Sequence, residues 1–303
     1  MALQGVRVAI QKPIDRTIPV VSNQVTVSPL TDDQKAEVLD FLSARPLHTV
    51  FLAGFIRDNG MVSPLNRGAF YAARNGEGRL EGVGLIGHAT LIESRSDAAL
   101  EAFAHFARAC PSAHMILGEK KKVSSFWRHY ANAGETPRMV CRELLMETRR
   151  PARGFKQVPG LRVATLDDID CVMKVNAEMA FSESGVNPLE RDPAGFRARV
   201  ARRIEQGRVW LWSDRGRLIF KAEVMSETDE VVYLEGVYVD PRERGTDQGL
   251  RCFSQLCETL MARGVSVCLL VNEKNRKARA FYRKAGYGLR SRYDTIFLRQ
   301  KNG

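Results

Sequence analysis

The stretch VYVDPRERGTDQGLRCF, residues 237–253, contains residue types that could hold a phosphate group. A β-rich run leads into a loop with Gly245 and Gly249, and an amphipathic segment follows. A helix that begins after such a loop exposes backbone N–H groups with partial positive charge, and glycine lets an anion approach without a Cβ in the way. Three arginines add positive charge: Arg242, Arg244 and Arg251.

The same loop has a feature that argues against phosphate. Asp247 stands where a third glycine would be expected, and its carboxylate would repel an anion. An aspartate near a helix start can also cap the free N–H groups. The alternative interpretation of the whole stretch is an ordinary strand-to-helix turn with a solvated basic face.

Composition narrows the kinds of chemistry that are open to the chain. It has 303 residues, 44% of them hydrophobic and 27% charged, as in a globular protein of about two domains. All five histidines lie in the first half, so a site in the second half cannot use a Ser-His pair, a Cys-His pair or a histidine-ligated metal. The six cysteines have no metal-like spacing, and we expect no metal.

The net charge of +11 predicts attraction of anions. Nucleic acid is one candidate, but the densest basic cluster, residues 119–123, has no interleaved aromatic residues, and specific nucleic-acid binding is not expected. No run of 18 apolar residues exists, and the N-terminus lacks a secretory signal pattern, so we expect no membrane partner and a cytoplasmic location.

The chain divides into two halves with a similar order of elements. We predict an N-terminal extension over 1–25, a first domain over 26–149, a linker over 150–160 and a second domain over 161–303. In the first half we expect strands and helices over 69–74, 79–92, 96–109, 114–118, 122–133 and 138–147. In the second half we expect helices over 192–206 and 249–263, a hairpin around 214–216, a buried strand over 265–271 and a closing strand over 293–299.

The second half resembles the GNAT superfamily of acyl-CoA-dependent N-acetyltransferases. The family pattern is a strand ending V-x-V-x-P, then R-G-x-G-x-G or Ala, an amphipathic helix, a buried strand, N-x-x-A and F-Y-x-x-x-G-F/Y. The matching residues are Val237, Val239, Pro241, Arg244, Gly245, Gly249, Asn275, Ala278, Phe281, Tyr282, Gly286 and Tyr287. The resemblance covers about residues 160–299, and Asp247 departs from it. The first half resembles a degenerate copy, as in tandem members of the family.

The resemblance implies a fold and a cofactor site. The fold is α/β, with two GNAT-like domains, each a central, mostly antiparallel mixed sheet flanked by helices. Acetyl-CoA would be the acyl donor, held by the strand end, by the loop amides and by the next helix, although Phe281 can equally be a core aromatic. The positions implied are Val237, Tyr238, Val239, Arg244, Gly245, Thr246, Asp247, Gln248, Gly249, Leu250, Asn275 and Phe281.

The resemblance also implies catalytic residues. Tyr282 would donate a proton to the departing thiolate, with a core aromatic as the alternative. Glu235 matches a strand position that serves as general base in some members, with a solvent-facing glutamate as the alternative and Glu230 as a lesser candidate. Glu178 and Glu183, in the segment that frames the acceptor in this family, could attract a cationic amine, or they could be merely solvated.

The first half lacks these features, because its turn IESRSDAAL (92–100) has no glycine and Trp127 stands where Tyr282 stands later. We therefore expect one working site, in the second half, that acetylates a primary amine of a small molecule or a protein. The alternative is a GNAT-fold protein that binds an acyl-CoA as a sensor or scaffold. The acceptor, the length of the acyl group, the effect of Asp247 on CoA binding and a homodimer are left open by the sequence.

Overall fold

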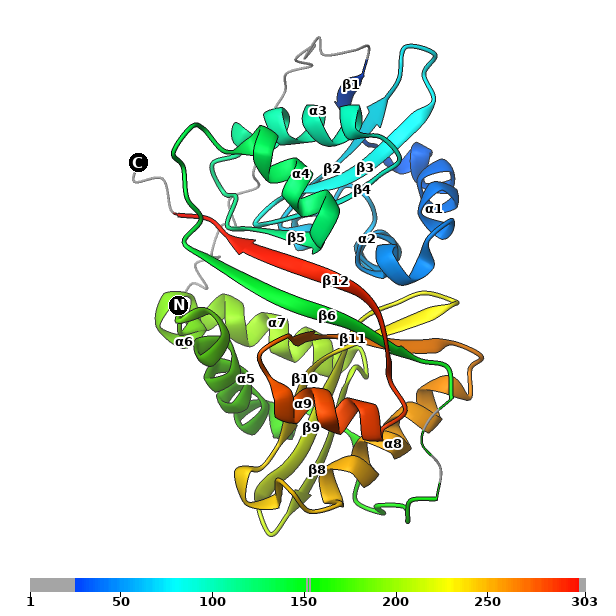
Figure 1. Ribbon diagram of the computed structural model, residues 1–303. Coiled ribbons are helices and arrows are strands. Elements are labelled where there is room, and N and C mark those ends of the chain that lie inside the picture. The colour runs from blue at the N-terminus through cyan, green and yellow to red at the C-terminus, as the bar shows by residue number, and fades with distance from the viewer. Residues whose placement is uncertain (1–24, 151, 153, 300–303) are drawn as a thin grey trace, which may run out of the picture. The chain divides into compact units, whose positions relative to one another are not determined.

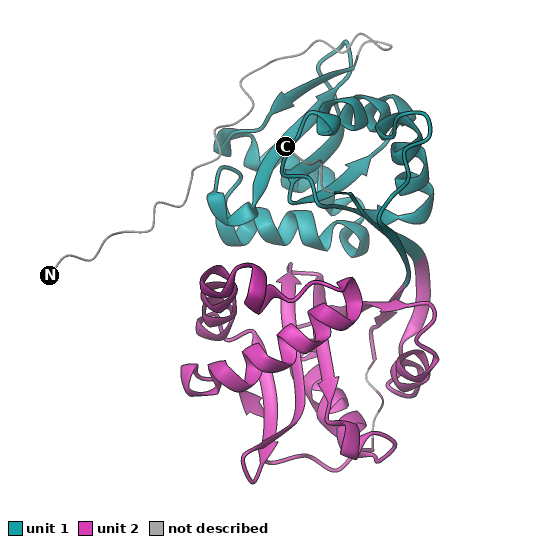
Figure 2. Cartoon of the chain, turned by 90° about the vertical axis from the view of Figure 1, so that its left-hand side faces the viewer, with its two compact units in different colours: residues 1–143, 292–303 teal, residues 144–291 magenta. Residues whose placement is uncertain are grey.

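A computed structural model describes residues 25–150, 152 and 154–299 of the chain (Figure 1). The predicted N-terminal extension, except for Val25, and positions 151 and 153 of the predicted linker lie outside these described residues. The described residues form two compact units, residues 25–143 with 292–299 and residues within 144–291 (Figure 2). Both have a mixed, mostly antiparallel sheet flanked by helices, which confirms the predicted fold class.

The first unit contains the strands β1 to β5 and two pairs of helices. Its elements are β1 (Thr26–Pro29), α1 (Lys35–Ser43), α2 (Pro46–Asn59), β2 (Gly68–Arg74), β3 (Leu80–Gly87), β4 (Ala89–Ser94), α3 (Asp97–Arg108), β5 (Met115–Glu119) and α4 (Lys120–Tyr130), with short 3-10 turns at Asp32–Gln34 and Pro64–Asn66. Alternation along β2 builds a core on each face, because Tyr71 packs with α3 and α4 while Phe70 packs with α1 and α2.

The second unit repeats this arrangement. Its elements are β7 (Arg162–Val163), α5 (Ile169–Ser184), α6 (Pro188–Arg191), α7 (Pro193–Glu205), β8 (Val209–Asp214), β9 (Arg217–Glu227), β10 (Val231–Val239), α8 (Gln248–Met261), β11 (Ser266–Asn272) and α9 (Arg276–Lys284), with 3-10 turns at Leu166–Asp168 and Pro241–Glu243. The predicted hairpin is confirmed: Arg215 and Gly216 both have positive φ, as a tight two-residue turn requires.

The two faces of the second sheet have different partners. Phe253, Leu256 and the other buried residues of α8 pack with the apolar side of β9 and β10 and with α9. The helices α5 and α7 cover the opposite face, through residues such as Val172 and Val200. Side chains on both faces of β9 and β10 therefore lie near helices, and polar ones such as Lys221 and Glu223 are buried, whereas Glu235 is exposed.

Two strands belong partly to each unit, β6 (Met139–Thr148) and β12 (Gly288–Phe297). In the first unit the strand order runs β1-β2-β3-β4-β5-β12, and in the second it runs β6-β11-β10-β9-β8-β7. The expectation that residues 293–299 close the second sheet is wrong, since Tyr293–Phe297 pair antiparallel with Met115–Glu119. Ile296 and Leu298 bury their side chains in the core beneath α3 and α4, which stabilises this pairing.

One further strand prediction needs correction. The run over 79–92 is two antiparallel strands, β3 and β4, because the chain reverses at Gly87 and His88. A Cβ at Gly87 would clash with the carbonyl oxygen of Arg67, so only glycine fits this close backbone approach. The apolar pattern alone does not show the reversal, because both strands are largely buried.

Candidate active site

The central feature of the second unit is a place where two parallel strands separate. Val231–Tyr233 of β10 pair with Ser266–Cys268 of β11, and the pairing ends there. Beyond Tyr233, β10 continues to Val239 with β9 as its partner on one side. Among the described residues, no strand pairs with the other edge of this segment, which therefore presents main-chain donors and acceptors. The predicted residues Val237, Tyr238 and Val239 all belong to it.

A bulge in β10 shapes this open segment. Between Glu235 and Tyr238 the strand β10 has one more residue than β9 has between Glu223 and Lys221. Gly236 takes φ +61°, and a Cβ there would lie 2.8 Å from Nζ of Lys221. The positive φ favours glycine at the bulge, and a larger residue would also displace the lysine ammonium.

The loop after β10 ends in a helix start with free amides. Gly245 takes φ +90°, and a Cβ at Gly249 would lie 2.7 Å from Cγ2 of Val239, so both glycines have a structural reason. The N–H of Gln248 donates to Oγ1 of Thr246 at 3.3 Å. Within the described chain, the N–H groups of Gly249 and Leu250 have no acceptor. Such a helix start can bind an anion.

Asp247 lies at this helix start without capping it. Its backbone has φ −78° and ψ −5°, an ordinary conformation that needs no glycine, which explains why the position tolerates a side chain. The carboxylate is exposed and makes no capping hydrogen bond, so the expectation that it could cap the helix is not met. The amides remain free, with a negative charge beside them.

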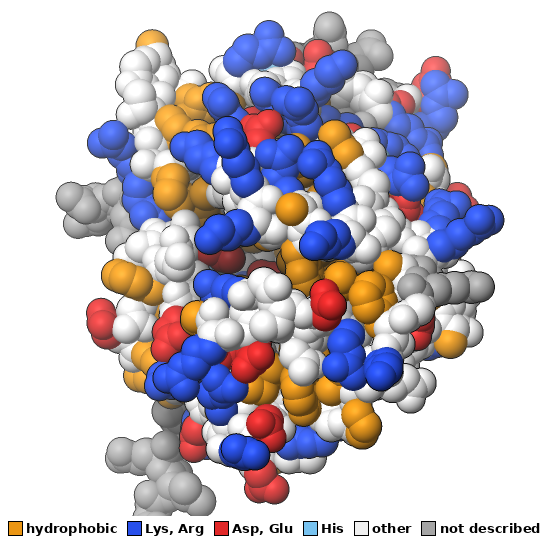
Figure 3. Space-filling model, turned by 60° about the horizontal axis from the view of Figure 1, so that its bottom comes forward, with side chains coloured by type: hydrophobic (Ala, Val, Ile, Leu, Met, Phe, Trp, Pro, Cys, Tyr) orange, Lys and Arg blue, Asp and Glu red, His pale blue; other side chains and the backbone are white. Residues whose placement is uncertain are grey.

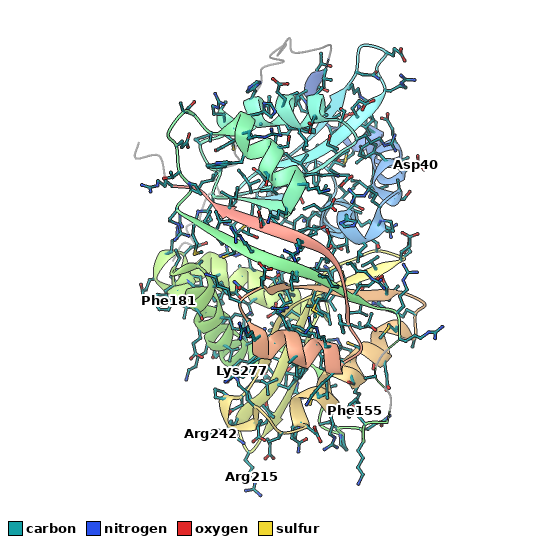
Figure 4. The ribbon with its side chains drawn as sticks, viewed as in Figure 1. Asp40, Phe155, Phe181, Arg215, Arg242 and Lys277 are labelled. Atoms are coloured by element: carbon teal, nitrogen blue, oxygen red, sulfur yellow. The ribbon has the colours of Figure 1, made fainter. Side chains whose placement is uncertain are left out.

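The three arginines of the loop have different surroundings. Arg251 is hydrogen-bonded to the segment before β7. Its Nε donates to the carbonyl of Lys156 at 2.9 Å, and its Nη2 donates to the carbonyl of Gln157 at 3.0 Å. Nε of Arg244 donates to the carbonyl of Val239 at 3.0 Å. Arg242 is exposed (Figure 4). Only Arg242 and the outer nitrogens of Arg244 can therefore approach a ligand.

Positive charge is also common on the surface around the site. The exposed first turn of α9 carries Arg276 and Lys277, the latter labelled in Figure 4. Figure 3 shows one face of the molecule on which lysine and arginine side chains gather, with acidic side chains scattered among them. The basic residues at the start of α9 suit an anionic ligand.

Tyr282 and Phe281 lie next to each other on α9. Tyr282 is 8% exposed, and its ring centroid lies 5.5 Å from that of Phe253 and 6.0 Å from that of Tyr287. Burial, with the nearby Cys257 thiol and Glu183 carboxyl, raises the pKa of Tyr282, so the phenol keeps its proton at neutral pH. Phe281 is half-buried and packs against the same core.

Asn275 caps the N-terminus of α9, which explains why an asparagine stands at this position. Its side-chain oxygen accepts a hydrogen bond from the N–H of Ala278 at 3.0 Å and caps α9. The side chain is exposed, so its amide nitrogen is open to solvent.

Glu235 lies on the face of β10 that α5 and α7 cover. It pairs across the sheet with Glu223, just before the bulge. Its side chain reaches solvent, yet the surrounding protein displaces much of the water near the carboxyl, and this desolvation raises the pKa of Glu235. The charge of Glu223 acts in the same direction, and those of Arg203 and Lys221 oppose it.

The two acidic residues predicted at the acceptor end both lie on α5. Glu178 and Glu183 are exposed, and the charge of Glu178 contributes to a raised pKa of Tyr238 after desolvation and Asp240. The charge of Glu183 likewise contributes to the raised pKa of Tyr282. Both carboxylates therefore act electrostatically on residues that the sequence places in the site.

The sequence did not reveal a polar cluster beside Glu235. Glu223 on β9 is 3% exposed and accepts three hydrogen bonds: from Lys221 at 2.7 Å, from Asn176 of α5 at 2.7 Å and from Arg203 of α7 at 2.6 Å. Lys221 is fully buried. The alternation in RLIFKAEVMS was the available signal, but it is also typical of a strand with one face in water.

The first unit repeats the strand geometry with different side chains. Ala89–Leu91 of β4 pair in parallel with Met115–Leu117 of β5. Glu93 follows Leu91 by two residues, as Glu235 follows Tyr233, and is held by Arg45 at 3.0 Å and Lys122 at 2.6 Å.

The helix start of the first unit also differs, because Oγ of Ser96 accepts the N–H of Ala99 at the start of α3. These contacts support the prediction that this copy holds no CoA, which stays a prediction.

Two further properties concern the whole described chain. Across residues 25–150, 152 and 154–299, no group of three or more His, Cys, Asp or Glu side chains is arranged to hold a metal ion. No helix of this part of the chain combines the length and the apolar character needed to cross a bilayer. All six cysteines are free thiols.

Comparisons with known proteins agree with this geometry. Residues 177–287 match the acetyltransferase (GNAT) family, which confirms the resemblance that the sequence motifs indicated for this half. A comparison with curated proteins gave no match.

Several solved structures have the same fold. A GNAT-family acetyltransferase from Colwellia psychrerythraea is 11% identical, with a TM-score of 0.58, over 91% of this chain and 100% of that one. A tandem GNAT protein from the clavulanic acid biosynthesis pathway is 16% identical, with a TM-score of 0.58, over 90% and 98%. A Drosophila protein is 14% identical, with a TM-score of 0.62, over 91% and 99%. The tandem GNAT-like fold therefore extends over both halves.

Proposed function

We propose that the second unit transfers an acetyl group from acetyl-CoA to an amine. The observation that carries this proposal is the open edge of β10 beyond Tyr233, followed directly by a helix start with free amides at Gly249 and Leu250. An extended chain with amide groups can add to a strand edge, and a pyrophosphate can bind a helix start. The pantetheine arm and the pyrophosphate of acetyl-CoA present these two kinds of group.

The residues at the site fit acetyl-CoA, except that one carboxylate opposes the negative charge of its phosphates. Val237 to Val239 offer main-chain groups to the arm, and the free amides of Gly249 and Leu250 lie at the end of the loop for the phosphates. Arg242 can approach the same place, while Asp247 opposes it. We infer that acetyl-CoA binds, less tightly than it would without this carboxylate.

Two side chains of the unit supply the proton transfers of the reaction. Acetyl-CoA brings the activated acyl group. Glu235, whose pKa is raised by desolvation, accepts a proton from the acceptor amine as the amine attacks. Tyr282, held in its protonated form by burial, donates a proton to the departing sulfur. Glu178 and Glu183 give α5 a negative end that attracts a cationic amine, which releases one proton to solvent and then attacks as the neutral amine.

A second function is favoured by Asp247. A protein that binds an acyl-CoA weakly and reports its level needs the strand edge and the loop but not the proton transfers. The exposed carboxylate at the helix start, which takes part in no capping bond, would keep the affinity low. Such a sensor differs from the enzyme by a lack of turnover with any amine.

The experiment compares binding with turnover in three proteins. Acetyl-CoA is titrated calorimetrically, and release of CoA thiol is followed in the presence of amines. We expect Tyr282→Phe to bind acetyl-CoA like the wild type and to lose about 10²-fold or more in turnover. Tyr287→Phe is the matched control, because it removes a hydroxyl from a neighbouring buried ring, where it contacts the Cys257 thiol at 3.2 Å.

The outcomes separate the two functions. Binding without thiol release in the wild type would support the sensor and refute the enzyme. An equal loss of turnover in both tyrosine variants would assign the effect to packing, and Tyr282 would no longer be the acid. Absence of binding in all three proteins would refute both functions.

A further inference from the structure

The cluster around Glu223 has more positive charge than one carboxylate can match. Lys221 and Arg203 both donate to Glu223, and Asn176 adds a third hydrogen bond. Oε1 accepts two of these bonds and Oε2 accepts one. Glu235, opposite Glu223 in the strand register, is the remaining anion beside the two cations.

Packing does not explain this cluster. The rest of the core between α5, α7 and the sheet consists of apolar side chains such as Val172, Val200 and Leu211. Removing a charge from water costs several kcal/mol, and apolar residues of similar volume often give equal or greater stability. Charged groups kept in such a place, next to a residue with a raised pKa, indicate a functional site.

Arg203 is only partly used by the cluster. It donates to Glu223 through Nη1, whereas its Nε and Nη2 have no acceptor in the described part of the chain. Its side chain is 28% exposed, so these donors can reach a ligand. Directly opposed residues on an antiparallel pair have Cβ atoms about 5 Å apart, which places Glu235 one side chain away from this guanidinium.

We propose that the acceptor carries a carboxylate close to its amine, as in an amino acid, and that Arg203 binds this carboxylate through its free donors. The proposal rests on the proposed acetyl transfer and names its substrate class. Arg203 would bind and orient the acceptor, and Glu235 would receive its proton. Guanidinium is the side chain best suited to hold a carboxylate through more than one hydrogen bond.

Charge balance through the reaction supports this class of acceptor. The amine nitrogen forms a bond to the acetyl carbon while the carbon–sulfur bond breaks. The amine proton passes to Glu235, and the proton of Tyr282 passes to the sulfur. Once Glu235 is neutral, Lys221 and Arg203 share the single charge of Glu223, and a carboxylate on the acceptor supplies the missing negative charge.

The first test uses the wild type and pairs of acceptors that differ only in the carboxylate. Common amino acids are compared with the amines formed by removing the α-carboxylate, through release of CoA thiol from acetyl-CoA. Rates are expressed per neutral amine, because removing the carboxylate also changes the pKa of the amine. A charged hydrogen bond contributes about 1.5–3 kcal/mol, so we expect kcat/KM to favour the amino acid by about 10- to 100-fold.

The second test replaces Arg203. In Arg203→Gln we expect the ratio of kcat/KM for the amino acid to kcat/KM for the amine without a carboxylate to fall to about one. The change should appear in the KM of the acceptor, and the affinity for acetyl-CoA should stay unchanged. Arg197→Gln is the matched control on the same helix, because the Arg197 guanidinium pairs with the exposed Asp170 at 2.7 Å. Fluorescence of Trp210 and Trp212 on β8 checks that each variant is folded.

The outcomes distinguish this inference from the proposed function. Equal use of amino acids and of the amines without a carboxylate overturns the inference and leaves acetyl transfer standing. Acetyl-CoA binding without acetylation of any acceptor overturns both. An undiminished carboxylate preference in Arg203→Gln also overturns the inference, since the carboxylate must then bind elsewhere.

Discussion

Replacing Glu223 by glutamine should destabilise the second unit more than any surface substitution. The change keeps the shape of the side chain and removes its charge. Lys221 is fully buried, and its ammonium group has no other hydrogen-bond acceptor among the described residues. Glu223→Gln therefore removes the hydrogen-bonded counter-charge of this buried cation and leaves only the more distant carboxyl of Glu235 near it.

The size of the effect follows from the surroundings of the carboxyl. Burial alone would raise the pKa of Glu223, but the charges and hydrogen bonds of Lys221 and Arg203 lower it from 4.5 to about 2. At about 1.36 kcal/mol per pH unit, this corresponds to on the order of 3 kcal/mol. Breaking a buried ion pair by removing one partner costs about 3–5 kcal/mol, which agrees. We expect a loss of about 3 kcal/mol.

The assay is urea unfolding followed by tryptophan fluorescence. A Trp127→Phe background leaves Trp210 and Trp212, both on β8 of the second unit, so the signal reports that unit alone. The pKa of Glu223 is lower in the folded protein, so its contribution is present above about pH 4.5 and is lost as the pH falls toward 2. The difference between wild type and Glu223→Gln should shrink over this window.

Two results would refute the reasoning. A loss of less than about 1 kcal/mol at pH 7 would mean that the carboxylate does not compensate the buried ammonium. The same conclusion would follow if Lys221→Met, added to Glu223→Gln, failed to restore part of the stability, because that change removes the uncompensated charge. Asp170→Asn, at an exposed ion pair, is the control, with an expected effect below about 1 kcal/mol.

Three further outcomes test the site. Glu235→Gln should lower turnover. In a pH–rate profile it should also abolish the rise in activity that accompanies deprotonation of Glu235, whose pKa is raised. If the activity of the variant still rises with pH as in the wild type, Glu235 is not the base. Asp247→Asn should tighten acetyl-CoA binding by roughly fivefold at low salt and less at high salt, by calorimetry, and weaker binding would contradict the assumed repulsion. Gly249→Ala should reduce acetyl-CoA affinity, because a Cβ would lie 2.7 Å from Val239 and displace the helix start; unchanged affinity would place the phosphates elsewhere.

The motifs of the second half predicted the local structure well, since each depends on backbone conformation. Gly245 and Gly249 mark a positive φ and a close approach that no other residue allows, so the sequence identifies the loop directly. The helical stripe predicted α8 and the apolar run over 265–271 predicted β11, each within one or two residues of its bounds. Asn275 was predicted as a cofactor contact, and the structure adds a capping role that its type and position also explain.

The sequence could not show which strands pair across the chain. Tyr293–Phe297 has the pattern of any half-buried strand, and its partner β5 lies more than 170 residues earlier. The cluster around Glu223 was missed for a related reason. A lysine and a glutamate that alternate with apolar residues normally indicate a solvent-exposed face of a sheet. The sequence of β9 does not show that helices cover this face.

The most direct test of the account is the number of acetyl-CoA molecules that bind to one full-length chain. Calorimetric titration should give one site, since the free amides of Gly249 and Leu250 have no counterpart at the start of α3, where Ser96 accepts the N–H of Ala99. Asp247→Asn should raise the affinity of that site, and Ser96→Ala should leave it unchanged. Two sites per chain, or no heat of binding at all, would contradict the account.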